Sequence, residues 1–168
     1  SAGELGSGTH LAGELFNIMA GVKIVRIPYK GAGPALTGVI TGEAQIMFAI
    51  IGSAMTHIKS GRLRALGVSS LQPTPLAPGL PTIASAGLPG YEALQIQGVW
   101  APAKTPAAVV NRLHDEIVRV LNRSEVKKRL FDSGMEVVGS TPKAFTDFLE
   151  ADMGTLRKLI RDVGIKAN

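Results

Sequence analysis

The chain has 168 residues, a formal net charge of +5, 45% hydrophobic residues and 18% charged residues. This composition is typical of a folded α/β protein and excludes an intrinsically disordered chain. The absence of cysteine excludes disulfides, thiolate metal sites and cysteine nucleophiles. No stretch approaches the roughly 18 consecutive apolar residues of a membrane-spanning helix. Basic and acidic residues alternate through the C-terminal third, as on solvated helix faces, so we expect no nucleic-acid binding.

The first part of the chain alternates predicted helices and strands. A loop rich in glycine and hydroxyl groups leads into a predicted helix over 9–20, which Ser7 or Thr9 caps. Apolar periodicity then predicts three strands, over 22–27, 44–50 and 62–69. Between them, a turn is expected over 28–33, and glycine stops predict helices over 34–41 and 52–60. This alternation favours a small domain with a parallel-rich sheet.

The second part of the chain is predicted to be mainly helical. A proline- and glycine-rich connection over 72–90, with a short helix at 82–85, precedes a predicted strand over 94–101 that carries Trp100, expected in the core. Three helices are then expected, beginning at Thr105-Pro106, at Ser124 and after Ser140-Thr141-Pro142. The predicted short strand over 135–138 has no local partner, and a lone strand needs a sheet to join.

The loop before the first helix is the strongest candidate binding feature. A helix N-terminus directs backbone N–H groups and the positive end of its dipole forward, which suits a carboxylate or a phosphate. Ordinary helix capping accounts for the same glycine, serine and threonine residues. The three histidines, His10, His57 and His114, lie far apart in the sequence, so we expect no metal site.

Seven motifs in succession resemble the periplasmic solute receptors of tripartite tricarboxylate transporters, the Bug receptors. They cover essentially the whole chain and read SAGELGSGTHLAGELF, IPYKGAGPAL, GEAQIMF, HIKSGRLRALGVSS, LPTIASAGLPGYEA, APAKTPAAVVNRLHDEI and GSTPKAFTDFL. The resemblance implies an α/β fold of the periplasmic-binding-protein type (type II, Venus flytrap), present in part. Residues 1–97 would form the second lobe, and residues 98–168 would cross the hinge and complete the first lobe. An N-terminal half is expected before the SAG loop.

The resemblance also implies a ligand site. Its loop residues would hold one ligand carboxylate, and further contacts would come from a turn, a strand end and the hinge; these residues are Gly6, Ser7, Gly8, Thr9, His10, Tyr29, Lys30, Gly31, Phe48, Ala49 and Gln97. His10 is expected to be a group that orients or packs against its neighbours, rather than a base. This sequence departs from the usual pattern of the family in two places. Two residues, Glu4 and Leu5, separate glycines that one residue usually separates, and Ala49 replaces an aspartate that suits amino-acid ligands.

The implied function is capture of a small carboxylate by lobe closure and its delivery, in the periplasm, to the membrane components of a transporter. No cofactor, metal or catalytic residue is expected. One alternative is the effector-sensing domain of a transcriptional regulator, which would need a helix-turn-helix that these residues do not contain. A second is an enzyme, but no Ser/His/acid set can be assembled from the sequence. We also expect self-association, because apolar surface meant for the absent half needs cover.

Overall fold

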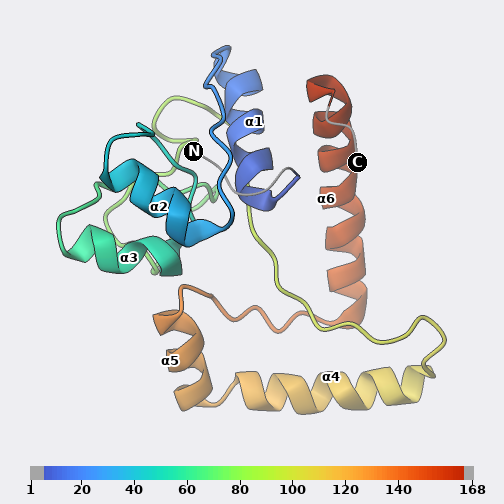
Figure 1. Cartoon of the computed structure of the whole chain (residues 1–168). Helices are drawn as coiled ribbons and strands as arrows, with labels where there is room; N and C mark the ends of the chain where they lie inside the picture. Colours follow the sequence, from blue (N-terminus) through green and yellow to red (C-terminus); the bar gives the residue numbers. More distant parts are fainter. Residues whose placement is uncertain (1–5, 165–168) are drawn as a thin grey trace. The chain divides into compact units, whose positions relative to one another are not determined.

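The computed structural model describes residues 6–164 of the chain. Within that range the regular secondary structure consists of α-helices (Figure 1), namely α1 Gly8–Ala20, α2 Ala32–Ile40, α3 Ile51–Lys59, α4 Ala107–Leu121, α5 Ser124–Asp132 and α6 Pro142–Val163. The chain divides into two compact units. The first unit runs up to Gln95 and includes the residues from Lys158 onward, and the second unit spans Ile96–Arg157. That these units are the two lobes of a receptor stays a prediction.

The six helices confirm the long helices predicted from the sequence, and at α1 and α6 the expected start and stop residues act as caps. The Ser7 hydroxyl oxygen accepts a hydrogen bond from the backbone N–H of His10 (3.3 Å) and so caps α1. Thr141 caps α6 in the same way, accepting from the backbone N–H of Ala144 (3.2 Å). Gly21 and Gly164, which follow α1 and α6, have φ values of 64° and 72°, the left-handed conformation that glycine adopts without strain.

The predictions of β-strands and of a parallel-rich sheet are wrong, because no β-ladder forms among residues 6–164. The segments concerned are 22–27, 44–50, 62–69, 94–101 and 135–138. One isolated parallel bridge joins Val68 and Thr82. Apolar alternation indicates an extended segment, but a strand exists only where a neighbouring strand supplies hydrogen bonds. Here side chains and loops supply part of that bonding instead; the Ser69 hydroxyl, for example, donates to the carbonyl of Ala93 (2.7 Å).

The predicted short helix over 82–85 is also wrong. These residues form a turn, in which the Thr82 hydroxyl oxygen accepts from the backbone N–H of Ser85 (3.0 Å). A threonine side chain that bonds the backbone three residues ahead offers the chain an alternative to a helical turn. The turn leads on to Tyr91, which belongs to the core of the first unit.

The core of the first unit is built around α1 and three aromatic rings. Tyr91 is fully buried, and its hydroxyl donates to the carbonyl of Ala12 in α1 (2.9 Å). The ring of Phe16 lies 6.0 Å from that of Tyr91 and 5.8 Å from that of Phe48, measured between centroids. Burial raises the pKa of Tyr91 to about 12, so its phenol keeps its proton and its hydrogen bond at neutral pH. This anchor fixes α1, whose N-terminus carries the predicted ligand loop.

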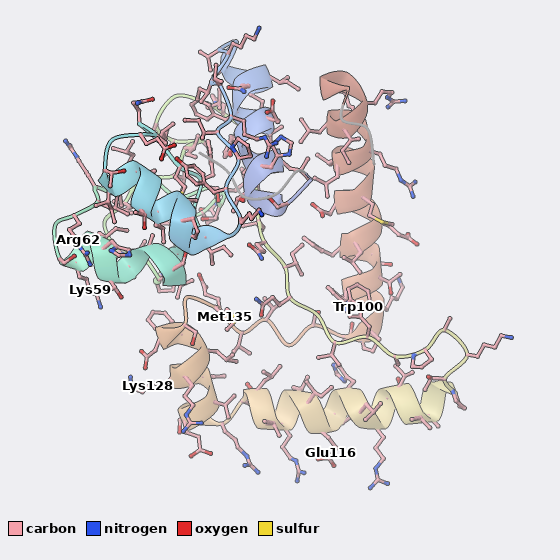
Figure 2. The ribbon with its side chains drawn as sticks, viewed as in Figure 1. Lys59, Arg62, Trp100, Glu116, Lys128 and Met135 are labelled. Carbon is pink, nitrogen blue, oxygen red and sulfur yellow. The ribbon has the colours of Figure 1, made fainter. Side chains whose placement is uncertain are left out.

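The second unit has no buried residue, although every residue from Ile96 to Arg157 is described. Apolar side chains of α4, among them Val109 and Leu113, are exposed. Figure 2 shows Glu116 of α4 and Lys128 of α5 extending from their helices. The expectation that Trp100 lies in the core is wrong: it is 69% exposed, although its ring lies 5.2 Å from the ring of Phe145.

Candidate functional site

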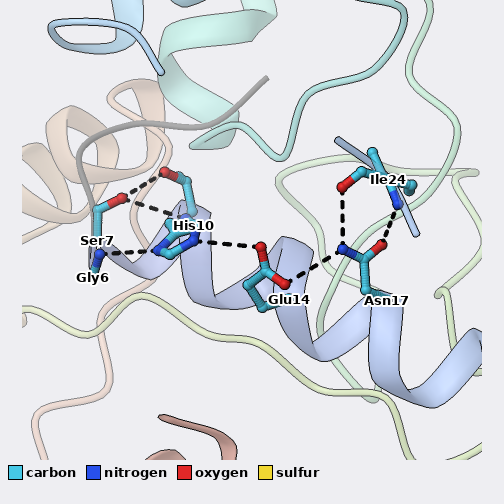
Figure 3. Close-up of polar contacts among 7 residues, drawn as sticks. Gly6, Ser7, His10, Glu14, Asn17 and Ile24 are labelled. Carbon is cyan, nitrogen blue, oxygen red and sulfur yellow. Dashed lines mark hydrogen bonds and ion pairs between the residues drawn. The ribbon is translucent and has the colours of Figure 1, made fainter. Parts of the chain in front are cut away.

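Five of the predicted residues are consecutive in the chain and lie at the start of α1. Gly6 has a φ of 78°, so the chain turns sharply just before Ser7 begins the helix. The hydroxyl groups of Ser7 and Thr9 share a hydrogen bond of 3.2 Å. The backbone N–H of Gly6 donates to Nδ1 of His10 (3.0 Å), which closes the loop (Figure 3). We call residues Gly6–His10 the ligand loop; residues 3–5 of the predicted motif lie outside the described residues.

His10 is the most enclosed side chain of the ligand loop, with 5% of it exposed. Because its Nδ1 accepts the Gly6 N–H, the ring proton of the neutral imidazole is on Nε2, which faces a carboxylate oxygen of Glu14 at 3.5 Å. Burial and the positive charge of Arg26 lower the pKa of His10, against the opposing effect of Glu14. His10 is therefore neutral at neutral pH and does not serve as an exposed charge. That it orients the loop stays a prediction.

A chain of polar contacts continues from His10 along α1 (Figure 3). The Asn17 amide donates to the second carboxylate oxygen of Glu14 (3.4 Å) and to the carbonyl of Ile24 (3.3 Å). In return, the backbone N–H of Ile24 donates to the Asn17 side-chain oxygen (2.9 Å). The sequence analysis missed Glu14 and Asn17. Their spacing from His10, four and seven residues, is the helical signal that places all three on one face.

A small hollow lies beside this chain of contacts. Its volume is about 30 Å³, enough for about two water molecules and too small for a dicarboxylate. The residues that line it come from α1 and the segments near 24–26 and 46–48, and are His10, Gly13, Glu14, Asn17, Ile24, Val25, Arg26, Ile46 and Phe48. The hollow therefore does not itself enclose a ligand of that size.

The predicted turn residues Tyr29, Lys30 and Gly31 lie just before α2. The Tyr29 ring rests against the α2 backbone at Gly38, where an added Cβ would overlap the hydroxyl oxygen. That oxygen is shielded from solvent, and this shielding, followed by the effect of the nearby Glu43 carboxylate, raises the pKa of Tyr29. Gly31 has a φ of 97° and starts the helix, and Lys30 is exposed. Lys30 is thus the accessible charge of this turn.

The remaining predicted residues have different surroundings. Phe48 packs on Phe16, and its ring lies where an added Cβ on Gly13 would contact it at 3.5 Å, so it supports α1. Ala49 is exposed, next to the start of α3. Gln97 is exposed and belongs to the second unit, so the ligand loop and Gln97 lie in different units. That these residues bind a ligand stays a prediction.

Other chemistries find little support in the part of the chain that the structure describes. Residues 6–164 contain no group of three or more histidine, aspartate or glutamate side chains placed to hold a metal ion. Nor does any helix within that range combine the length and apolar character needed to cross a bilayer.

Residues 1–165 match the family described as the tripartite tricarboxylate transporter family receptor, TctC. One curated relative is the "UPF0065 protein in tcbD-tcbE intergenic region" of Pseudomonas sp. strain P51. It is 38% identical over 169 residues, which cover 100% of this chain and 50% of the relative. The chain thus spans about half the length of such relatives.

Solved structures agree with the family match. A structure described as "R. palustris Rpa4515 with adipate" is 32% identical with a TM-score of 0.84, over 98% of this chain and 56% of that one. One described as "MatC (Rpa3494) from Rhodopseudomonas palustris with bound malate" is 26% identical with a TM-score of 0.75, over 95% and 56%. A "periplasmic transporter" structure is 32% identical with a TM-score of 0.76, over 98% and 56%.

These matches confirm the resemblance drawn from the seven motifs. They also identify the fold as part of a periplasmic-binding-protein fold, because the solved structures align with nearly all of this chain and with just over half of their own length. The family consists of transporter receptors, which are binding proteins rather than enzymes, in agreement with the prediction that the chain is not an enzyme. The chain belongs to the tripartite tricarboxylate transporter receptor family, TctC, whose members include the Bug proteins.

Proposed function

We propose that the chain forms part of an extracytoplasmic receptor that captures a small dicarboxylate and delivers it to the membrane components of a tripartite tricarboxylate-type transporter. The observation that carries the proposal is the ligand loop: five predicted residues meet at the N-terminus of a 13-residue helix, held in one shape by their own hydrogen bonds. The adipate and malate in two related structures support the ligand class. The related periplasmic transporter structure supports a periplasmic location.

The ligand loop would bind one carboxylate of the ligand. A helix N-terminus carries roughly half a positive charge, which favours an anion by about 0.3–1 kcal/mol at an exposed site. Ser7 and Thr9 add hydroxyl groups beside it. Lys30 would attract the second carboxylate, and Ala49 provides no acidic group for the ammonium of an amino acid. The proposal therefore favours plain dicarboxylates over amino acids.

Capture would require a second surface. The hollow beside α1 is too small to enclose a dicarboxylate, so a ligand at the ligand loop would need further contacts. Closure of a second lobe over the ligand would complete its contacts, and the ligand would stabilise the closed state because it touches both lobes. Gln97 is the contact that the family resemblance assigns to the hinge.

Isothermal titration calorimetry of the chain with adipate, with malate and with 1,6-hexanediol tests the ligand class. Hexanediol has the length of adipate without its charges. We expect heat of binding with the two acids and none with the diol. Lys30→Ala should weaken adipate binding about ten- to hundred-fold, as expected for a charged hydrogen bond. Lys59→Ala, at the end of α3 (Figure 2), is the matched control and should bind normally. Equal binding of adipate and hexanediol would overturn the proposal.

A further inference from the structure

We propose that His10 is a positioning residue of the ligand loop: its neutral imidazole, oriented by Glu14 and Asn17, holds the Gly6 peptide N–H and so keeps the loop in its binding shape. The part of this inference that concerns ligand affinity rests on the proposed function. The part that concerns the loop rests on geometry within the first unit. Gly6 precedes the helix and, as a glycine, can adopt many backbone conformations, so the hydrogen bond from its N–H to Nδ1 of His10 is the tether that selects its φ of 78°.

The tether depends on the protonation state of His10. Nδ1 receives the Gly6 N–H at 3.0 Å, and an imidazole nitrogen accepts a hydrogen bond only when it carries no proton. Protonated His10 would place two N–H groups against each other at this position. The bond to Gly6 would then be lost, and the turn before Ser7 would lose the contact that closes it.

The orientation of the ring is set from outside the loop. Glu14 faces Nε2 of His10 with one carboxylate oxygen and accepts from the Asn17 amide with the other. Asn17 in turn makes two hydrogen bonds with the backbone of Ile24, one in each direction. Ile24 lies five residues before Tyr29, where the second predicted ligand segment begins. The polar chain therefore joins the ligand loop to the segment that carries Tyr29–Gly31.

The charged groups around His10 favour its neutral form on balance. Glu14, on α1, favours the protonated imidazole, whereas Arg26, from the segment after α1, disfavours it. Burial disfavours it further, and burial is the largest of these effects. The contact between His10 and Gly6 is accordingly expected to hold at neutral pH and to weaken as the solution becomes acidic.

Two substitutions of His10 test the roles of its two ring nitrogens separately. In His10→Asn, the side-chain oxygen takes the place of Nδ1, so the acceptor for Gly6 is kept, nothing titrates and the contact with Glu14 is lost. In His10→Gln, the longer amide reaches the position of Nε2, so the contact with Glu14 is kept and the acceptor for Gly6 is lost. If His10 only fills space, both variants should have the same effect on Gly6.

Nuclear magnetic resonance of the ligand-free chain measures the contact directly. We expect the nitrogen shifts of His10 to show the Nε2–H tautomer at pH 7.5. Hydrogen exchange at the Gly6 amide should be about five- to ten-fold faster in His10→Gln and within about two-fold of the unmodified chain in His10→Asn. As the pH is lowered, and after correction for intrinsic exchange, Gly6 should lose protection in the unmodified chain and keep it in His10→Asn. An Nδ1–H tautomer, or equal protection in both variants, would overturn the inference.

Adipate titration of the same variants tests the link to binding. His10→Gln should weaken adipate binding by a factor similar to its effect on Gly6 exchange, and His10→Asn should leave it within about two-fold. Thermal unfolding of each variant shows that it is folded. Altered Gly6 protection with unchanged adipate affinity would overturn the ligand loop as the binding site and leave the His10 contact standing. The two measurements thus distinguish failure of the inference from failure of the proposed function.

Discussion

Helices in both units carry the same kind of apolar sequence pattern, but the apolar side chains are buried in the first unit and not in the second. In the first unit, apolar side chains of α1 and α2, such as Leu11 and Leu36, are buried together with Tyr91. In the second unit, α4 has an equally regular apolar stripe, yet Leu113 is 49% exposed and no residue of 96–157 is buried. An apolar stripe therefore determines that a helix forms, and a partner surface determines whether the stripe is covered. The predicted ligand loop lies in the unit that has a core, where its shape can be held.

The largest expected difference between the units is in the free energy of unfolding that is lost when an aromatic side chain is removed. Tyr91→Ala removes a fully buried ring and its hydrogen bond to Ala12, and should lower the free energy of unfolding by about 3–5 kcal/mol. The matched change Trp100→Ala removes a larger but exposed ring and should cost less than about 1.5 kcal/mol. Urea unfolding followed by circular dichroism measures both. Equal losses would contradict the contrast between the units.

A smaller effect is expected where a glycine meets an aromatic ring. Gly38→Ala adds a Cβ that overlaps the Tyr29 hydroxyl, which is shielded and has little room to move. It should cost about 1–2 kcal/mol, even though alanine favours a helix by about 1 kcal/mol relative to glycine. Gly98→Ala overlaps the end of the Phe145 ring in the second unit, which the absence of a core leaves freer to turn away. Thermal unfolding should therefore show a smaller loss for Gly98→Ala.

The pH dependence of stability is expected to originate in part from the first unit. The folded state lowers the pKa of His10 below its ordinary value of 6.5, so the unfolded chain takes up the proton more readily. The contribution of His10 to the free energy of unfolding is complete above about pH 6.5 and is lost as the pH falls below it. Urea titrations at pH 7.5 and pH 5.5 should show a smaller decrease for His10→Asn. An identical decrease in both proteins would rule out this origin.

The smallest expected effect lies on the surface of the second unit. Lys128 of α5 donates to Asp132 at 2.7 Å, but both side chains are largely exposed and screened by solvent. Lys128→Ala should change the free energy of unfolding by no more than about 0.5 kcal/mol. A loss above about 1.5 kcal/mol by urea unfolding would mean that the second unit depends on its surface ion pairs, in contrast to the first.

The sequence by itself determined the helices and the family. Helix caps and helix stops act on residues only a few positions away; examples are Ser7, Thr141 and Gly21. The local sequence pattern therefore suffices to place the ends of α1 and α6. The seven motifs likewise identified the TctC family, because motif order is a property of the chain alone. Five residues of the ligand loop could be grouped for the same reason, since they are neighbours in sequence.

Only the tertiary structure decided which segments pair and which side chains are covered. The predicted strands needed partners that residues 6–164 do not supply, and Trp100 needed a second packing surface to be buried. The contact of Tyr91 with Ala12 spans 79 residues, and that of Asn17 with Ile24 crosses a turn. Local propensity carries no information about such contacts, because they depend on how distant segments meet. The support of the ligand loop was therefore visible only in the folded chain.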